Sequence, residues 1–141
     1  MILLGAGLLI LAAGAYLFSV GRYADYTTRS KVTDLVNVAG VCKTSVAEFY
    51  QERRRMPAGE AEAQCGALQG TYSSPARVKD GVITVQAAGK LKAELEGFGS
   101  GIELRYTPRC TGGSCNGASI EAWDCKTGTT IQPRHLPAMC R

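Results

Sequence analysis

Residues 31–50 read "KVTDLVNVAGVCKTSVAEFY", and the apolar side chains in this stretch recur at steps of three and four. This spacing places them on one face of an α-helix. Charged side chains such as Lys31, Asp34 and Lys43 fall outside that face. The face consists of Val32, Leu35, Val36, Ala39, Cys42, Val46, Phe49 and Tyr50. The sequence therefore predicts an amphipathic helix whose apolar stripe has to be covered by another part of the chain.

The predicted helix extends in both directions from this stretch. Pro57 is the first proline, and residues just before a proline avoid helical geometry, so the helix should end near Arg54. On the other side, residues 1–21, "MILLGAGLLILAAGAYLFSVG", carry no charged side chain, and Arg22 is the first one. We expect a single helix over residues 2–54 that is wholly apolar in its first half and amphipathic in its second.

The apolar segment has the length of a membrane span, because about 20 helical residues cover about 30 Å, the thickness of a bilayer's hydrocarbon core. It has no basic start and no clear small-residue cleavage site, as a removed signal peptide would. We expect it either to span a membrane or to be buried against copies of itself. Gly7, Gly14 and Gly21 would let neighbouring helices approach closely, or are simply tolerated in an apolar helix.

The part of the chain after Pro57 predicts a small antiparallel sheet. A connection rich in small residues, 57–76, leads into "ARVKDGVITVQA", where Asp80-Gly81 separates two β-prone runs and indicates a hairpin. Two further strands are predicted in "GIELRYTPR" and "ASIEAWDCK". Three or four strands need cover on one face, and the stripe of the long helix is the available partner. The predicted fold class is α+β.

Six cysteines, an apolar anchor and the absence of a CxxC pair indicate disulfides formed in an oxidising compartment. Paired ligands at the spacing of a structural zinc site are missing. A Cys42–Cys65 bridge would fix the connection to the helix, although the sequence does not dictate it. Cys110 and Cys115 bracket a glycine-rich turn that is short enough for a local bridge. A Cys125–Cys140 bridge would close a loop of 15 residues and contribute about 3 kcal/mol in the chain-entropy model.

Catalytic and cofactor motifs are not found in the sequence, which offers no arguable Ser-His-Asp set, phosphate loop or HExxH motif. We predict that the protein is not an enzyme and uses no cofactor. His135, the one histidine, is expected to be a loop residue without chemistry. The net charge of +4 is mild and does not by itself indicate nucleic acid.

A run of basic residues offers one possible exception. Arg53, Arg54 and Arg55 end the predicted helix, and Lys126 and Arg134 lie near the C-terminus. Clustered cations could contact the phosphates of DNA. The alternative interpretation of the arginine run is a solvated helix end that complements the helix dipole.

Three stretches, distributed over most of the chain, resemble the type IV pilins. They are "YADYTTRSKVTDLVNVAGVCKTSVAEFYQ", "GVITVQ" and "AWDCKTGTTIQPRHLPAMCR". The last is the most specific, with its tryptophan, both cysteines, "LP" and a final "CR" in place. The resemblance implies a structural subunit that polymerises into an extracellular pilus filament for adhesion, twitching motility or DNA uptake. It also implies the Cys125–Cys140 disulfide.

The resemblance further implies how the chain is divided. Residues 1–22 would anchor the chain in the bacterial inner membrane before assembly and form the filament core afterwards. Residues 23–56 would be the amphipathic half of the same helix, and residues 57–141 the globular head. The expected filament-core residues are Leu3, Leu4, Gly7, Leu8, Leu11, Gly14, Phe18 and Gly21.

The expected partners are other copies of the chain, the pilus assembly machinery and a prepilin peptidase. Met1 would be the mature, modified N-terminus. The sequence departs from the family at the start of the helix, where Leu4 and Gly5 stand near the usual glutamate and Asp25 is the first acid. The alternative function is that of a minor pilin that receives DNA through its basic residues.

Overall fold

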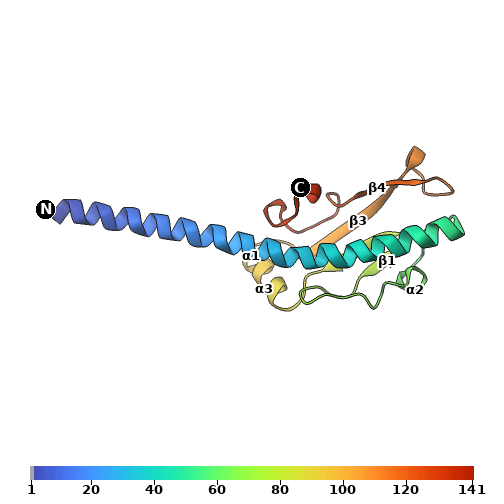
Figure 1. Ribbon diagram of the computed structural model, residues 1–141, viewed down its shortest axis with the longest axis horizontal. Coiled ribbons are helices and arrows are strands. Elements are labelled where there is room, and N and C mark those ends of the chain that lie inside the picture. Colours follow the sequence, from blue (N-terminus) through green and yellow to red (C-terminus); the bar gives the residue numbers. More distant parts are fainter. Residues whose placement is uncertain (1) are drawn as a thin grey trace.

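The computed structural model describes residues 2–141, and side chains from residue 7 onward. Met1, predicted as the modified N-terminus, lies outside the described residues. One long helix carries a small head on its second half (Figure 1). The helices and strands are α1 (Ile2–Arg53), α2 (Glu60–Ala63), β1 (Arg77–Lys79), β2 (Val82–Gln86), α3 (Gly89–Gly97), β3 (Glu103–Cys110) and β4 (Ile120–Asp124). Three short 3-10 helices complete the chain: η1 (Thr111–Gly113), η2 (Pro133–His135) and η3 (Ala138–Cys140).

The single long helix predicted from the sequence is confirmed, and it ends one residue before the predicted position. Arg54 takes a left-handed conformation with φ of 55°, and its N–H donates to the carbonyl of Tyr50 at 2.8 Å. A left-handed residue just beyond the last turn is a common way to end a helix. Pro57 follows three residues later and prevents the helix from continuing.

The sheet has four antiparallel strands in the order β1-β2-β3-β4, as predicted. Asp80 and Gly81 connect β1 to β2, with φ values of 50° and 79°. Positive φ at both central residues fits the twist of the flanking strands, which explains the Asp-Gly signal in the sequence. The register pairs Ile83 with Tyr106, so two large apolar side chains lie together on the face that meets α1.

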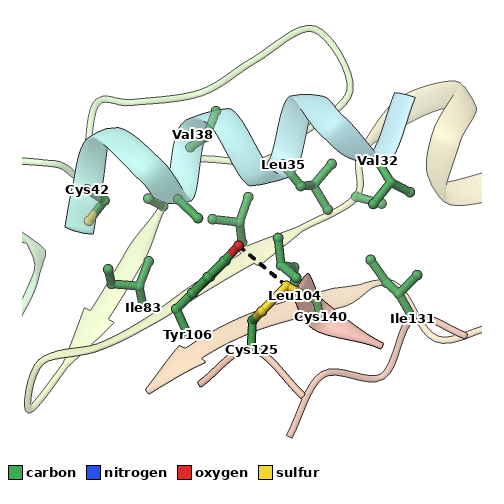
Figure 2. Packing of buried hydrophobic residues seen from close by; sticks show 14 of the residues in the cluster. Val32, Leu35, Val38, Cys42, Ile83, Leu104, Tyr106, Cys125, Ile131 and Cys140 are labelled. Carbon is green, nitrogen blue, oxygen red and sulfur yellow. Dashed lines mark hydrogen bonds between the residues drawn. A yellow bond between two sulfur atoms is a disulfide. The ribbon is translucent and has the colours of Figure 1, made fainter. Parts of the chain in front are cut away.

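The core forms where the second half of α1 crosses this face of the sheet (Figure 2). Leu35 and Cys42 of α1 lie opposite Ile83, Leu104 and Tyr106 of the sheet, and all five side chains are buried. The predicted stripe is therefore the face that packs. Within it, Val32, Leu35, Ala39, Cys42, Val46 and Tyr50 are buried, and Val36 and Phe49 are partly exposed.

Helix α3 was not predicted from the sequence. Helix α3 spans nine residues between two glycines, and only Leu91 and Leu95 of its side chains are buried. These two leucines are four residues apart, which is the helical spacing, but the segment is too short for a strong periodic signal. Lys31 of α1 forms an ion pair with Glu94 of α3. The head therefore contacts α1 through this small helix as well as through the sheet.

The C-terminal loop is a packed part of the head. Cys125 and Cys140 form a disulfide, as predicted, and Ile131 and Leu136 within the loop are buried. Two other disulfides join Cys42 to Cys65 and Cys110 to Cys115. The loop is also held to α1, because the guanidinium of Arg29 donates to the carbonyl of Arg134 at 2.6 and 3.1 Å.

His135 lies in this loop, where it was expected, but its side chain is completely buried. Its Nε2 accepts a hydrogen bond from Arg134 Nε at 3.2 Å, and its Nδ1 lies 3.9 Å from the carboxylate of Asp25. Burial lowers the pKa of His135, and the nearby charges of Arg134 and Arg29 act in the same direction. The carboxylate of Asp25 opposes this shift. The neutral imidazole is therefore the form that fits the closed loop.

Replacement of Leu35 by alanine should test whether the helix–sheet contact carries the stability of the head. The side chain is fully buried at the centre of that contact, so we expect Leu35→Ala to lower the free energy of unfolding by about 2–5 kcal/mol. Val41 lies on the same helix but is 53% exposed, so Val41→Ala should cost less than about 0.5 kcal/mol. Thermal and denaturant unfolding of the detergent-solubilised chain, followed by circular dichroism, measures both. Equal losses would contradict this account of the core.

The buried His135 should make the head less stable in weak acid. Because its pKa in the fold lies below the ordinary value of 6.5, the unfolded chain binds a proton at a higher pH than the folded chain. The free energy of unfolding should therefore fall as the pH drops below 6.5, until the pH passes the pKa of the folded state. Denaturant unfolding at several values between about pH 7 and pH 5 measures this slope. His135→Gln should flatten the slope, and an unchanged slope in that variant would assign it to other groups.

Candidate assembly interface

Residues 7–22 of α1 project from the head, and no described part of the chain buries them (Figure 1). Its side chains are strongly exposed: 75% for Leu8, 75% for Leu11 and 63% for Phe18. The helix is long and apolar enough to cross a membrane, and its most apolar stretch is not buried at all. A helix that is apolar on every side is stable in lipid or against another apolar surface, but not in water.

The residues predicted for the filament core lie along this projecting segment. Those with described side chains are Gly7, Leu8, Leu11, Gly14, Phe18 and Gly21, whereas the side chains of Leu3 and Leu4 lie outside the described part. Residues seven apart complete almost two helical turns, so the three glycines follow nearly one line along the helix. A Cβ added at any of them would meet no atom within 4 Å. The head therefore gives no reason for these glycines, and the space beside them is open to another molecule.

The apolar segment changes into a polar one over little more than one turn. The guanidinium of Arg22 lies 4.5 Å from the ring centre of Phe18, and Tyr23 and Tyr26 are both about 70% exposed. Asp25 follows as the first carboxylate. Tyrosines next to a basic residue are typical of the boundary between the hydrocarbon and the aqueous side of a membrane.

The basic run at the other end of α1 is only partly free. Arg53 and Arg54 are exposed and form no ion pair with any described residue. Arg55 instead pairs with Glu62 at 2.8 Å and lies over the ring of Phe49. Its guanidinium, together with the N–H of Ala58, lowers the pKa of Glu62 to about 2. Arg55 is thus already engaged within the chain.

The structure does not bring the five predicted DNA-binding residues together. Arg134 lies 4.0 Å from Asp25, at the end of the head nearest the projecting helix. Arg53 follows Asp25 by 28 residues on the same straight helix, which corresponds to about 42 Å. Lys126 is exposed in the loop after β4, where its N–H donates to Asp124. They therefore do not form a single basic patch.

Sequence reasoning missed another group of basic residues on the outer face of the sheet. The register places Arg77 of β1 and Arg105 of β3 on either side of Thr84. With Lys79 they line an open hollow of about 370 Å³, which also contains two carboxylates, Glu60 and Glu103. The alternation of the predicted strands was the signal that could have placed these arginines on the solvent face. The mixed charges leave little net attraction for an anion.

The described residues offer few groups for chemistry. All six cysteines are in disulfides. Among residues 2–141, no three His, Cys, Asp or Glu side chains lie close enough to hold a metal ion. The most distinctive surface is therefore the exposed apolar helix, which is suited to association with lipid or with other helices.

Comparisons with known proteins agree with this geometry. A sequence model of the pilin family, described as a bacterial filament protein, matches residues 28–141. The type IV major pilin protein PilE1 of Neisseria gonorrhoeae is 28% identical over 132 residues, which cover 84% of this chain and 78% of the relative. The fimbrial protein EcpC of Eikenella corrodens is 28% identical over 123 residues, covering 84% and 74%.

A fimbrial protein of Neisseria meningitidis serogroup B is 25% identical over 134 residues, covering 84% of this chain and 79% of the relative. The family match covers the whole head and nearly all of the half of α1 that packs on it, and the apolar half-helix precedes it. The chain therefore belongs to the pilin family, as a structural filament subunit that resides in the membrane before assembly.

Proposed function

We propose that the projecting half of α1 is the polymerisation interface of a type IV pilus, and that copies of this chain bundle these segments in the filament core. The observation that carries the proposal is the exposure of large apolar side chains, from Leu8 to Val20, on a segment that the head leaves uncovered. The heads would then form the outer layer of the filament, with their disulfide-closed loops at the surface. The expected core residues, Leu3 to Gly21, belong to this proposal.

The energetics favour a segment that is a membrane anchor before assembly and part of the filament core afterwards. Removing apolar surface from water stabilises it by roughly 25 cal/mol per Å². The projecting half of α1 therefore has to be covered both before and after assembly. Lipid chains and neighbouring apolar helices are about equally apolar, and a transfer between them has little hydrophobic cost. Packing between helices then decides the outcome. Gly7, Gly14 and Gly21 would favour assembly by letting neighbouring backbones approach closely.

The geometry of the subunit supports an open polymer. The head and the projecting half lie at opposite ends of the rod, so copies that stack parallel with an axial offset make head-to-tail contacts. Head-to-tail contacts that do not close into a ring generate a helix of subunits. The pilus assembly machinery and a prepilin peptidase are proposed as partners on the family resemblance, and Met1 as the modified end.

The docking step between subunits would differ from that of pilins that carry the early glutamate. The first carboxylate of this sequence is Asp25, and its side chain faces His135 and Arg134 within the head. We propose that incoming subunits are aligned by the fit of apolar side chains along the helix rather than by an ion pair near its start.

Gly14→Leu should reduce filament formation without disturbing the head. No atom lies within 4 Å of a Cβ added at Gly14, so the variant should fold and insert into membranes normally. In a bundle, the larger side chain would hold neighbouring helices apart, and we expect at least a tenfold lower yield of filaments sheared from cells. Gly40→Leu is the matched control, because Gly40 has the same open surroundings but lies on the part of α1 that carries the head. Equal yields from the two variants would refute the proposed interface.

A second candidate function is reception of DNA by a minor pilin, and one observation favours it. Arg53 and Arg54 are adjacent, exposed and free of ion pairs with described residues at the end of the subunit farthest from the membrane anchor. Two cations at the outermost end of a rod would meet a long anionic polymer before other parts of the head do. Arg134 lies too far away to add to this pair.

Salt dependence would distinguish DNA reception from a solvated helix end. If Arg53 and Arg54 contact phosphates, duplex DNA binding should weaken steeply with salt, and Arg53→Gln/Arg54→Gln should reduce the log–log slope by about 2. Mobility-shift titrations of the detergent-solubilised chain at several salt concentrations give this slope. Lys126→Gln is the control, because it removes an exposed cation elsewhere on the head. A slope that the double variant leaves unchanged would rule out this function for the pair.

A further inference from the structure

Arginines gather where the projecting helix enters the head, next to the proposed assembly interface. We call this surface the head base and define it as Arg22, Arg29 and Arg134 with the aromatic ring of Phe98. The guanidinium of Arg134 lies over the ring of Phe98 at 5.4 Å. Arg29 donates to the carbonyl of Arg134, which fixes η2 against α1. Two separate parts of the chain are thus joined into one basic surface.

The charge of the head base is positive. This surface contains three guanidinium groups and one carboxylate, that of Asp25, which lies 4.0 Å from Arg134. The other acids nearby are engaged by lysines: Lys31 pairs with Glu94, and Lys92 lies 4.0 Å from Glu96. His135 adds no charge near neutral pH, because its pKa lies below the ordinary value. The surface therefore suits an anionic partner.

The position of the head base along α1 indicates which partner it meets. The chain resides in a membrane before assembly, and Arg22, the first charged residue, marks where the hydrocarbon layer ends. Asp25 lies three residues further on, about 5 Å along the helix axis. The headgroup layer on each side of a bilayer is about 5–8 Å thick. Arg134, which contacts Asp25, therefore lies at the depth of the lipid phosphates.

The aromatic residues at this level fit the same environment. Tyr23 and Tyr26 are among the most exposed aromatic side chains of the chain, and Phe98 is 37% exposed at the edge of the head. Tyrosines are enriched at the headgroup level of membranes. A tilt of about 20°, the average for membrane spans, presses Phe98 and Arg134 onto the bilayer when the helix leans toward the side that carries them.

We propose that the head base binds the anionic phospholipid headgroups of the membrane in which α1 is anchored, and that this contact orients the head before assembly. The guanidinium groups of Arg22 and Arg134 contact lipid phosphates, and Phe98 enters the interfacial layer beside them. Each cation near an anionic membrane surface should shift the balance between docked and lifted heads about fivefold. Removal of the subunit into a filament would break this contact.

A tryptophan placed at the head base can report docking in the full chain. Phe98→Trp keeps an aromatic ring under Arg134, and Trp123→Phe removes the one native tryptophan. The reporter chain is reconstituted into vesicles of phosphatidylcholine, or of phosphatidylcholine with roughly one third phosphatidylglycerol. A nitroxide on some lipid headgroups quenches a nearby tryptophan. We expect at least twofold stronger quenching in the anionic vesicles, and loss of that excess as salt rises from about 0.05 to 0.5 M.

Two charge variants of the reporter chain locate the effect. Arg22→Gln/Arg134→Gln should reduce quenching in anionic vesicles to the level of neutral ones. Arg53→Gln/Arg54→Gln removes the same charge about 42 Å away and should leave the quenching unchanged. Thermal unfolding checks that each variant is folded. If Arg22→Gln/Arg134→Gln does not fold, the salt dependence of quenching in the reporter chain with its native arginines decides whether charge holds the head to the membrane.

Three results would overturn the proposal. One is equal quenching in anionic and neutral vesicles, and another is an excess in anionic vesicles that salt does not reduce. The third is an equal loss in both charge variants, which would mean a general effect of net charge. If quenching is independent of lipid charge but Arg22→Gln/Arg134→Gln lowers filament yield, the head base binds an acidic group of a neighbouring subunit and not the membrane.

Discussion

The contact between the stripe of α1 and one face of the sheet is the interaction on which the rest of the structure depends. Leu35 and Cys42 meet Ile83, Leu104 and Tyr106 there, and these side chains are buried on both sides of the contact. A sheet with an apolar face has to bury that face against another element. The same holds for the apolar stripe of α1. Each element supplies the cover that the other needs, and the disulfides then fix the loops around this centre.

This contact also explains how one helix, α1, can carry both the folded head and the apolar projecting segment. The same helix continues from the core into the apolar segment without a break. Residues 2–53 contain no proline, and the helix ends only where Arg54 takes a left-handed conformation. The head uses one face of the helix, and the proposed assembly interface is the projecting half. Folding of the head and polymerisation would then involve different residues and would not compete.

The fold could largely be predicted because its main elements have strong local signals. The stripe from Val32 to Tyr50 has the helical period over five turns, and Asp80-Gly81 allows few structures other than a tight hairpin. Helix α3 could not be predicted with the same strength, because its only core residues are Leu91 and Leu95 and its place depends on contacts with α1. Trp123 is partly buried at the edge of the core, since the pairing with Pro108 sets which way β4 faces.

The sites were harder to predict than the fold, because they depend on distance in space. The basic residues Arg53 and Arg134 could be grouped in the sequence only by type, and the structure separates them by most of the length of the head. The proximity of Arg29, Arg134 and Phe98 had no sequence signal, since it comes from the return of the C-terminal loop to the start of the head. The apolar segment was the exception, because its exposure follows from composition alone.

The continuity of α1 has a mechanical consequence for a filament under tension. In the proposed filament, a pull would enter each subunit through the projecting half-helix and pass along a rod whose backbone hydrogen bonds lie parallel to the force. The sheet and the C-terminal loop are attached to the side of this rod; the Cys42–Cys65 bridge ties the segment after α1 back to it, and the Cys125–Cys140 bridge closes the C-terminal loop. The load would thus bypass the head, which would keep its surface intact while the filament core is stretched.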